Sequence, residues 1–260
     1  MSTLVVHSGL LTWRAVRALM RQPVFAVITL IQPIIWLLLF GALFKSVVDV
    51  PGFDARAGSY LEFITPGVIV MTALFSSSWA GTVYIEDMGR GVMDRLLASP
   101  VRRAAMMNGT LAYQSLVSLV QTVVVLAIAF VAGARFAGGL IGLVVTAVAA
   151  ALLTVVFAAL SNAVALLARQ QEALIGISQL LSLPLVFLSS AVMDPALAPS
   201  WLAQVARFNP LDWAVVASRS ALGGSPDWAL VWSRLGLLAM LALLMGWLAT
   251  RAFGAYQRSA

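Results

Sequence analysis

Charged and polar side chains gather most densely between residues 86 and 103, where the sequence reads EDMGRGVMDRLLASPVRR. Its adjacent acidic residues, Glu86 and Asp87, do not form a shared acid–base site, because neighbouring side chains on a helix point about 100° apart. Apolar residues at i, i+3 and i+4 instead predict a short helix with one apolar stripe, formed by Met93, Leu96 and Leu97. Asp94 and Arg95 point away from the stripe, and Pro100 ends the helix because proline lacks an amide donor. We expect this segment to be held by a partner molecule rather than to catalyse a reaction.

Few other side chains offer reactive chemistry. The chain has no cysteine, one histidine (His7) and one lysine (Lys45). Disulfides and thiolate metal sites are therefore excluded, and we expect neither a metal centre nor a cofactor in this chain. The G-x-S-x-G, H-E-x-x-H and G-x-x-x-x-G-K-[ST] motifs are missing, so the sequence predicts no enzyme activity and no phosphate-binding loop of its own.

The composition is that of an integral membrane protein: 62% of residues are hydrophobic, 10% are charged and the mean hydropathy is +0.98. A spanning helix needs about 20 apolar residues. Six stretches qualify, namely residues 24–44, 64–85, 104–133, 140–168, 173–193 and 228–250. Because these runs are continuous rather than alternating, helices are favoured over a barrel. We predict an all-α membrane fold in which residues 1–260 form a single domain.

The distribution of charge predicts the orientation of the six spans. With the N-terminus inside, the cytoplasmic segments hold ten basic and four acidic residues, and the outer segments hold six of each. This asymmetry satisfies the positive-inside rule and assigns the whole net charge of +6 to the cytoplasmic side. Since no soluble basic domain is present, nucleic-acid binding is not expected. We predict cytoplasmic N- and C-termini and location in the cell inner (plasma) membrane.

An amphipathic helix is predicted ahead of the first span, over residues 8–22. Its arginines lie on one side and its apolar residues on the other; the residues concerned are Trp13, Arg14, Arg17, Leu19 and Arg21. Such a helix lies flat in the membrane interface, and Pro23 marks the bend into the bilayer. The alternative is an ordinary positively charged flank. A signal peptide is not favoured, because the following apolar run is about twice as long as a signal core.

The last outer segment, residues 194–227, is rich in proline and glycine but carries two short apolar pieces, 201–208 and 213–222. These pieces are too short to span a bilayer, so we expect half-inserted, partly re-entrant helices. The spans themselves contain no deep carboxylate of the kind that proton-driven transporters need. Their neutral polar residues either satisfy one another between helices or face a translocation route. The route candidates are Gln114, Gln121, Asn162 and Gln179.

Two motifs resemble those of ABC-2 type transporter permeases, the membrane subunits of ABC exporters, and most closely the daunorubicin-resistance type. Glu86, Gly91 and the run DRLLASP at 94–100 are similar to the family's coupling region. The run FNPLDWAVVASR at 208–219 is similar to its outer signature before the last span, with Asn209, Pro210, Trp213 and Arg219 at the matching positions. Val92-Met93 replaces the commoner Thr-Leu, which bears on the subgroup rather than on the family.

The resemblance implies two permease chains, paired as a homodimer, with two ABC ATPase subunits docked below them. ATP and Mg²⁺ are then bound by the ATPase, and this chain needs no cofactor. The residues expected to couple to the ATPase are Arg90, Gly91, Met93, Asp94, Arg95, Leu96, Leu97, Ser99 and Pro100. Met93, Leu96 and Leu97 are expected to pack in an apolar groove of the ATPase.

The family resemblance leaves alternative functions open. Export of a lipid or an amphiphilic drug-like substrate suits an uncharged pathway, and export of a lipid-linked polysaccharide is the alternative within the family. A membrane-embedded lipid-modifying enzyme would need a carboxylate, histidine or metal cluster, and the sequence shows none. A passive channel would leave the segment at 86–103 without a purpose.

Overall fold

The computed structural model describes residues 3–21, 23–44, 59–98, 101, 103–192 and 200–258. Within them the chain is helical and contains no strand, which confirms the all-α prediction. The helices are α1 (Thr3–Met20), α2 (Pro23–Leu43), α3 (Tyr60–Ser78), α4 (Thr82–Gly89), α5 (Val92–Ala98), α6 (Arg103–Val131), α7 (Gly139–Ala168), α8 (Gln171–Phe187), α9 (Ser200–Ala206), α10 (Pro210–Leu222) and α11 (Trp228–Arg258).

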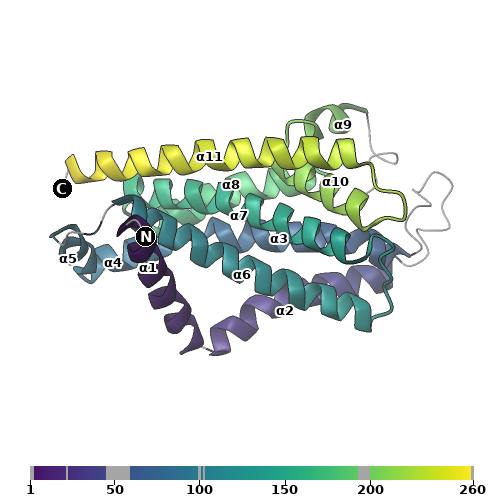
Figure 1. Cartoon of the computed structure of the whole chain (residues 1–260), viewed down its shortest axis with the longest axis horizontal. Coiled ribbons are helices and arrows are strands. Elements are labelled where there is room, and N and C mark those ends of the chain that lie inside the picture. Colours follow the sequence, from purple (N-terminus) through teal and green to yellow (C-terminus); the bar gives the residue numbers. More distant parts are fainter. Residues whose placement is uncertain are drawn as a thin grey trace.

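The long helices lie side by side along the longest axis of the molecule (Figure 1). The central helix is α7, which packs against α3, α6, α10 and α11. Its small residues Ala149, Ala150 and Ala158 are fully buried, and small side chains allow helices to approach closely. α4, α5 and the C-terminal end of α11 lie at one end of the bundle, which we call the coupling end (Figure 1). The connection from α10 to α11 lies at the opposite end, which we call the outer end after the predicted topology (Figure 1).

Four helical segments are long and apolar enough to cross a bilayer: Tyr60–Gly89, Ala104–Val131, Gly139–Ala168 and Trp228–Gly254. Each matches one of the six predicted spans. The other two predicted spans coincide with shorter apolar helices, Val27–Leu43 and Gln171–Phe187.

The predicted second span, 64–85, is not one continuous helix, because the chain leaves the helical path between Ser78 and Thr82. The carbonyl oxygen of Ser78 accepts hydrogen bonds from the hydroxyls of Ser161 at 2.7 Å and Ser178 at 2.9 Å. The amide of Gly81 donates to Ser161 Oγ at 2.9 Å. A Cβ atom on Gly81 would lie 2.4 Å from the carbonyl oxygen of Ser161, so the close approach of α7 requires glycine here. Serine hydroxyls from neighbouring helices therefore supply hydrogen-bond partners to backbone groups at the interruption of the helix.

The predicted fifth span, 173–193, is also longer than the helix observed, because α8 ends at Phe187. Carbonyl oxygens in and just after its last turn, those of Leu185 and Leu188, accept hydrogen bonds from Asn209 Nδ2 at 2.7 and 2.9 Å. Since the last carbonyls of a helix have no partner within it, this side chain satisfies groups that a continuing helix would have satisfied.

The amphipathic segment predicted at 8–22 is helical, but α1 begins five residues earlier, at Thr3. It runs obliquely to the long helices (Figure 1) and packs along α6. Thr12 Oγ1 donates to the carbonyl oxygen of Gly109 at 3.1 Å, and a Cβ atom on Gly109 would lie 2.9 Å from the Cβ atom of Leu11. The closeness of these two helices therefore depends on a glycine in α6.

Candidate coupling site and outer motif

A tight turn separates α4 from α5. Gly91 has φ +65°, in the left-handed region that favours glycine, and its amide donates to the carbonyl oxygen of Met88 at 3.1 Å. The chain therefore changes direction before α5 begins. The short helix predicted here is confirmed over Val92–Ala98, whereas Ser99 and Pro100 lie outside the described residues.

Met93 does not lie on the surface of α5, and here the structure differs from the prediction that it packs into a partner. Its side chain is fully buried in a cluster of this chain, whose members include Tyr84, Met106, Met107, Leu174 and Phe253. A side chain enclosed by its own chain has no free surface to offer a groove. Met93 instead fixes α5 to the bundle.

The accessible surface of α5 is formed by the residues around Met93. Leu96 and Leu97 are partly buried against the same cluster, whereas Asp94 and Arg95 are exposed. Arg90, just before the turn, is also exposed. The coupling end therefore presents two half-exposed leucines bordered by charged side chains.

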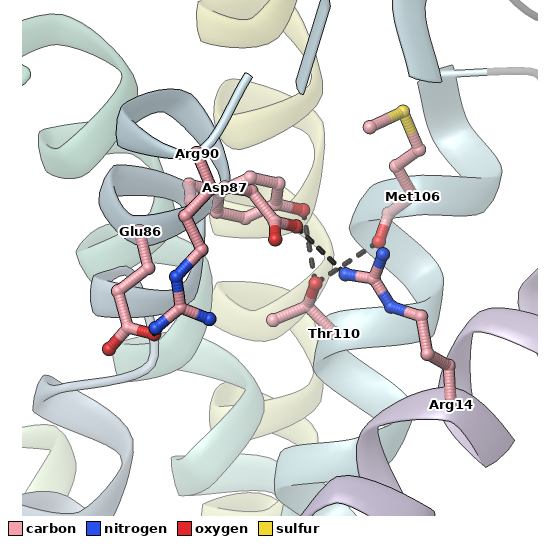
Figure 2. Close-up of polar contacts among 7 residues, drawn as sticks. Arg14, Glu86, Asp87, Arg90, Met106 and Thr110 are labelled. Carbon is pink, nitrogen blue, oxygen red and sulfur yellow. Dashed lines mark hydrogen bonds and ion pairs between the residues drawn. The ribbon is translucent and has the colours of Figure 1, made fainter. Parts of the chain in front are cut away.

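An ion pair joins α1 to α4 at the coupling end (Figure 2). Arg14 Nη2 lies 2.8 Å from Asp87 Oδ2, and the two side chains are 48% and 17% exposed. A second pair connects Arg90 to Glu86 at 3.4 Å, but it joins one turn of chain to the next and both side chains are largely exposed. The Arg14–Asp87 pair is the one that links separate helices.

Tyr84 connects α4 to two further helices. Its hydroxyl lies 3.1 Å from Thr110 Oγ1 in α6, and Thr110 in turn donates to the carbonyl oxygen of Met106 at 3.2 Å. Its ring meets the ring of Phe253 in α11 edge to face, with centroids 6.1 Å apart. Together with the Arg14–Asp87 pair, these contacts hold α4 against α1, α6 and α11.

The predicted residues of α1 divide between exposed and partly buried positions. Trp13, Arg14, Arg17 and Arg21 are exposed, and the guanidinium of Arg17 lies 5.7 Å from the centroid of the Trp13 ring. Leu19 is partly buried. Trp13 therefore lies with the arginines on the exposed surface, not on the side that packs against α6.

The outer motif forms the start of α10. Asn209 is the N-cap residue of this helix: its side-chain oxygen accepts from the amide of Leu211 at 2.9 Å while its Nδ2 binds the end of α8. Pro210 occupies the first helical turn, where its missing amide donor costs nothing. Trp213 Nε1 donates to the carbonyl oxygen of Arg207 at 2.6 Å. These residues place α10 rather than forming a reactive site.

Two side chains of α10, those of Asp212 and Arg219, bind Ser190. Asp212 Oδ1 accepts from the Ser190 amide at 2.8 Å and from its hydroxyl at 2.6 Å. Arg219 Nη2 donates to the Ser190 carbonyl oxygen at 2.8 Å, and its guanidinium lies 3.8 Å from the centroid of the Phe63 ring in α3. One face of α10 is buried against the bundle. The partly re-entrant segment predicted for 194–227 stays a prediction, and residues 193–199 of it lie outside the described residues.

The four route candidates do not share one environment. Gln114, Gln121 and Asn162 are buried, and Asn162 Nδ2 lies 3.3 Å from the sulfur of Met107. Gln179 is exposed on α8. The hydroxyl contacts at Ser78 show that other polar side chains of the spans do satisfy one another between helices.

Comparison with known proteins identifies the family. Residues 8–222 match the family described as ABC-2 type transporter. The chain belongs to this ABC-2 type transporter family. The matched region of the ABC-2 chain begins within α1 and ends with the last residue of α10, so it contains α4, α5 and the outer motif.

Relatives of this ABC-2 chain are named as permeases. It is 29% identical over 217 residues to the daunorubicin resistance ABC transporter permease protein DrrB1 of Streptomyces coeruleorubidus, covering 82% of this chain and 74% of that protein. It is 30% identical over 199 residues to the putative transport permease ycf38 of Cyanophora paradoxa, covering 76% and 67%. It is 26% identical over 199 residues to the probable doxorubicin resistance ABC transporter permease protein DrrC of Mycobacterium tuberculosis, covering 76% and 72%.

Sequence reasoning missed several residues that organise the ABC-2 chain. Asp212 lies inside the quoted outer motif but was not singled out, although a carboxylate within a helix of apolar periodicity signals a buried partner. The Arg14–Asp87 pair joins residues 73 positions apart and has no local signal. Ser78, Ser161 and Ser178 come from three different helices, α3, α7 and α8, and only the tertiary arrangement brings them together.

Proposed function

We propose that this chain is the membrane subunit of an ATP-driven exporter that moves lipids or amphiphilic drug-like molecules out of the cell. The observation that carries the proposal is the coupling end. There, within the region that matches the family, α4 and α5 are fixed to α1, α6 and α11 by buried and charged contacts. A rigid projection of this kind transmits an external push to the membrane helices, because packed elements move as units.

The partner is an ABC ATPase, present in two copies, that binds ATP and Mg²⁺ and contacts Leu96 and Leu97 through an apolar groove. Asp94 and Arg95 then lie at the rim of the contact, where they set orientation rather than affinity. Met93 acts from inside the chain by holding α5 in place. Energy enters through the ATPase, and this chain itself carries no catalytic residue.

The chain crosses the plasma membrane six times, with both termini in the cytoplasm. On α11, Trp228 and Trp247 are separated by 19 residues, a rise of roughly 28 Å at about 1.5 Å per residue, which matches a hydrocarbon core of about 30 Å. Arg251 stacks on Trp247 at 4.1 Å from the ring centroid, as suits the cytoplasmic interface. With 17 residues, α8 is a short span, and the buried segment after it completes the crossing. α1 lies in the cytoplasmic interface, with exposed arginines and tryptophan.

The substrate class rests on the relatives and on the character of the spans. Two relatives are named for resistance to daunorubicin and doxorubicin. The long spans of this chain are apolar and their polar residues are mostly neutral, with Arg234 near the start of α11 as an exception. This character suits an amphiphilic cargo. We place the export route between two copies of this chain, since one bundle with a buried centre leaves little room for a large molecule.

Reconstitution with the ATPase tests the proposal. In proteoliposomes, export of a fluorescent amphiphile is expected to require ATP, to stop when the catalytic acid of the ATPase is mutated, and to continue when an ionophore collapses the pH gradient. Export that runs without ATP and stops with the ionophore would refute it. Topology is tested in the same cysteine-free chain: a membrane-impermeant maleimide should label intact cells at Gly224→Cys but label Arg95→Cys only after lysis.

A further inference from the structure

We propose that a cavity at the outer end binds a zwitterionic phosphate group, of the kind found in the phosphoethanolamine headgroup of lipids. The cavity has a volume of about 260 Å³ and opens between the start of α3, the connection from α6 to α7, the end of α10 and the start of α11. The connections from α6 to α7 and from α10 to α11, which border it, lie at the end of the molecule opposite α5 (Figure 1), so the cavity is separate from the coupling end.

Charges of both signs line this cavity. Glu62, Asp227, Arg135 and Arg219 are among its lining residues. The guanidinium group of Arg135 also donates to the carbonyl oxygens of Phe130 at 3.2 Å and Ala134 at 3.0 Å. Two carboxylates disfavour a purely anionic ligand, and two guanidinium groups disfavour a purely cationic one. A ligand that carries an ammonium and a phosphate is complementary in charge to both sets, and guanidinium is well suited to phosphate oxygens.

These charged side chains are held in place before any ligand arrives. Glu62 Oε1 accepts the backbone amide of Arg135 at 2.9 Å, which ties α3 to the α6–α7 connection. Asp227 Oδ1 accepts an amide in the first turn of α11 at 3.0 Å. The guanidinium of Arg219 stacks on the Phe63 ring at 3.8 Å. Preorganised charges lower the entropy cost of binding.

The cavity is large enough for a lipid headgroup. Its volume of about 260 Å³ is many times the roughly 10–15 Å³ that a single water needs. Phosphoethanolamine, with about eight non-hydrogen atoms, fits within this space.

The surroundings place the cavity where lipid headgroups lie. Trp228 and Trp232, at the start of α11, are exposed, and tryptophan concentrates at the membrane–water interface. Phe136 and Leu222 add apolar surface to the cavity wall. A phospholipid of the outer leaflet therefore reaches the site with its headgroup while its acyl chains stay in the bilayer.

Competitive lipid binding to the purified full-length chain tests the site. The chain is incubated with equimolar phosphatidylethanolamine and phosphatidylglycerol, and retained lipid is measured by native mass spectrometry. We expect a preference for phosphatidylethanolamine. Glu62→Gln and Asp227→Asn keep an acceptor for the existing amide hydrogen bonds but remove one negative charge each. Each is expected to lower the preference about tenfold, the effect of losing one charge-assisted hydrogen bond.

A filling variant separates this cavity from the rest of the lipid-facing surface. Ala137 lines the cavity, and a Cβ atom on Gly224 would lie 3.5 Å from its Cβ, so Ala137→Phe closes the mouth. Ala132→Phe, at an exposed position outside the lining, is the control. Equal lipid preference in the wild type, Ala137→Phe and Ala132→Phe would overturn the proposal, as would loss of preference in Ala132→Phe alone.

Cysteine protection identifies the source of the ligand. The rate at which a water-soluble maleimide labels Ala137→Cys should fall in the presence of the zwitterion. Slowing by phosphatidylethanolamine vesicles alone assigns the site to lipid, whereas equal slowing by glycerophosphoethanolamine assigns it to a soluble molecule. An unchanged rate with both overturns the proposal. These measurements need neither ATP nor transport, so their outcome is independent of the proposed export function.

Discussion

Reversing the charges of the Arg14–Asp87 pair tests whether α1 and α4 move as one unit during transport. The change is made in three variants: Arg14→Asp, Asp87→Arg and the double exchange. Each single variant places two like charges where the wild type has an ion pair at 2.8 Å. The double exchange restores opposite charges with the partners swapped.

The expected magnitude follows from the exposure of the two side chains. Exposed ion pairs contribute about 0.2–1 kcal/mol. Because Asp87 is only 17% exposed while Arg14 is 48% exposed, this pair belongs near the upper limit of that range, at about 1 kcal/mol. Replacing attraction by repulsion roughly doubles the effect to about 2 kcal/mol, which is about a 30-fold change in an equilibrium between coupled and uncoupled arrangements. The double exchange should recover most of this loss.

The assay is ATP-dependent export in proteoliposomes, with ATP hydrolysis and the unfolding temperature measured on the same samples. Export per ATP should fall in the single variants and recover in the double exchange, and the defect should shrink at high salt because the pair is partly exposed. The Glu86–Arg90 pair supplies the matched control, Glu86→Gln, which leaves Arg90 in place: the side chains of Glu86 and Arg90 are 58% and 72% exposed, so breaking this pair should cost less than about 0.5 kcal/mol. A double exchange no better than the worse single variant would refute the reasoning.

Three further predictions concern packing and capping. Leu97→Asp should abolish stimulation of the ATPase while Leu97→Met preserves it, because only the first puts a charge at an apolar contact; copurification and ATP turnover measure this. Gly67→Ala should destabilise the chain by about 1–3 kcal/mol, because the added Cβ would lie 2.0 Å from the Ala191 carbonyl oxygen. Gly176→Ala is the control and should not destabilise it, because the space around Gly176 is open; denaturant unfolding measures both. Asn209→Ala should cost about 2 kcal/mol or more, measured in the same way, because it leaves one amide and two carbonyls without this partner.

The long spans were predictable because their apolar runs are uninterrupted. The predicted 104–133 and 140–168 correspond to α6 and α7 within a few residues, and the start of α11 at Trp228 was also predicted. Runs of this length have few alternatives in a membrane protein, since the bilayer requires helices. The short helix before Pro100 was predictable for a similar local reason: its apolar spacing and its flanking glycine and proline lie within a few residues.

The burial of Met93 was not predictable from that local pattern. Spacing at i, i+3 and i+4 shows that one face of α5 is apolar, but it does not say whether this chain or another covers that face. Met93 is covered by residues as distant in sequence as Phe253.

The same limit of local sequence patterns applies to the outer motif. Its Asn and Arg were recognised as a signature, yet their partners at Leu185 and Ser190 come from the preceding helix and the segment after it.

The two interruptions of the helical path are both bound by side chains of neighbouring helices, and this constrains how force passes through the chain. At the break after α3, Ser161 and Ser178 hold the Ser78 carbonyl oxygen. At the end of α8, Asn209 binds the final carbonyls. A break whose backbone groups lacked partners would be a point of bending, because opening it would cost no further hydrogen bonds. Here bending would sacrifice these hydrogen bonds, which are made by buried or partly buried groups. Displacement of α5 should therefore reach α7 and α8 as a movement of connected helices rather than be absorbed at the break between α3 and α4.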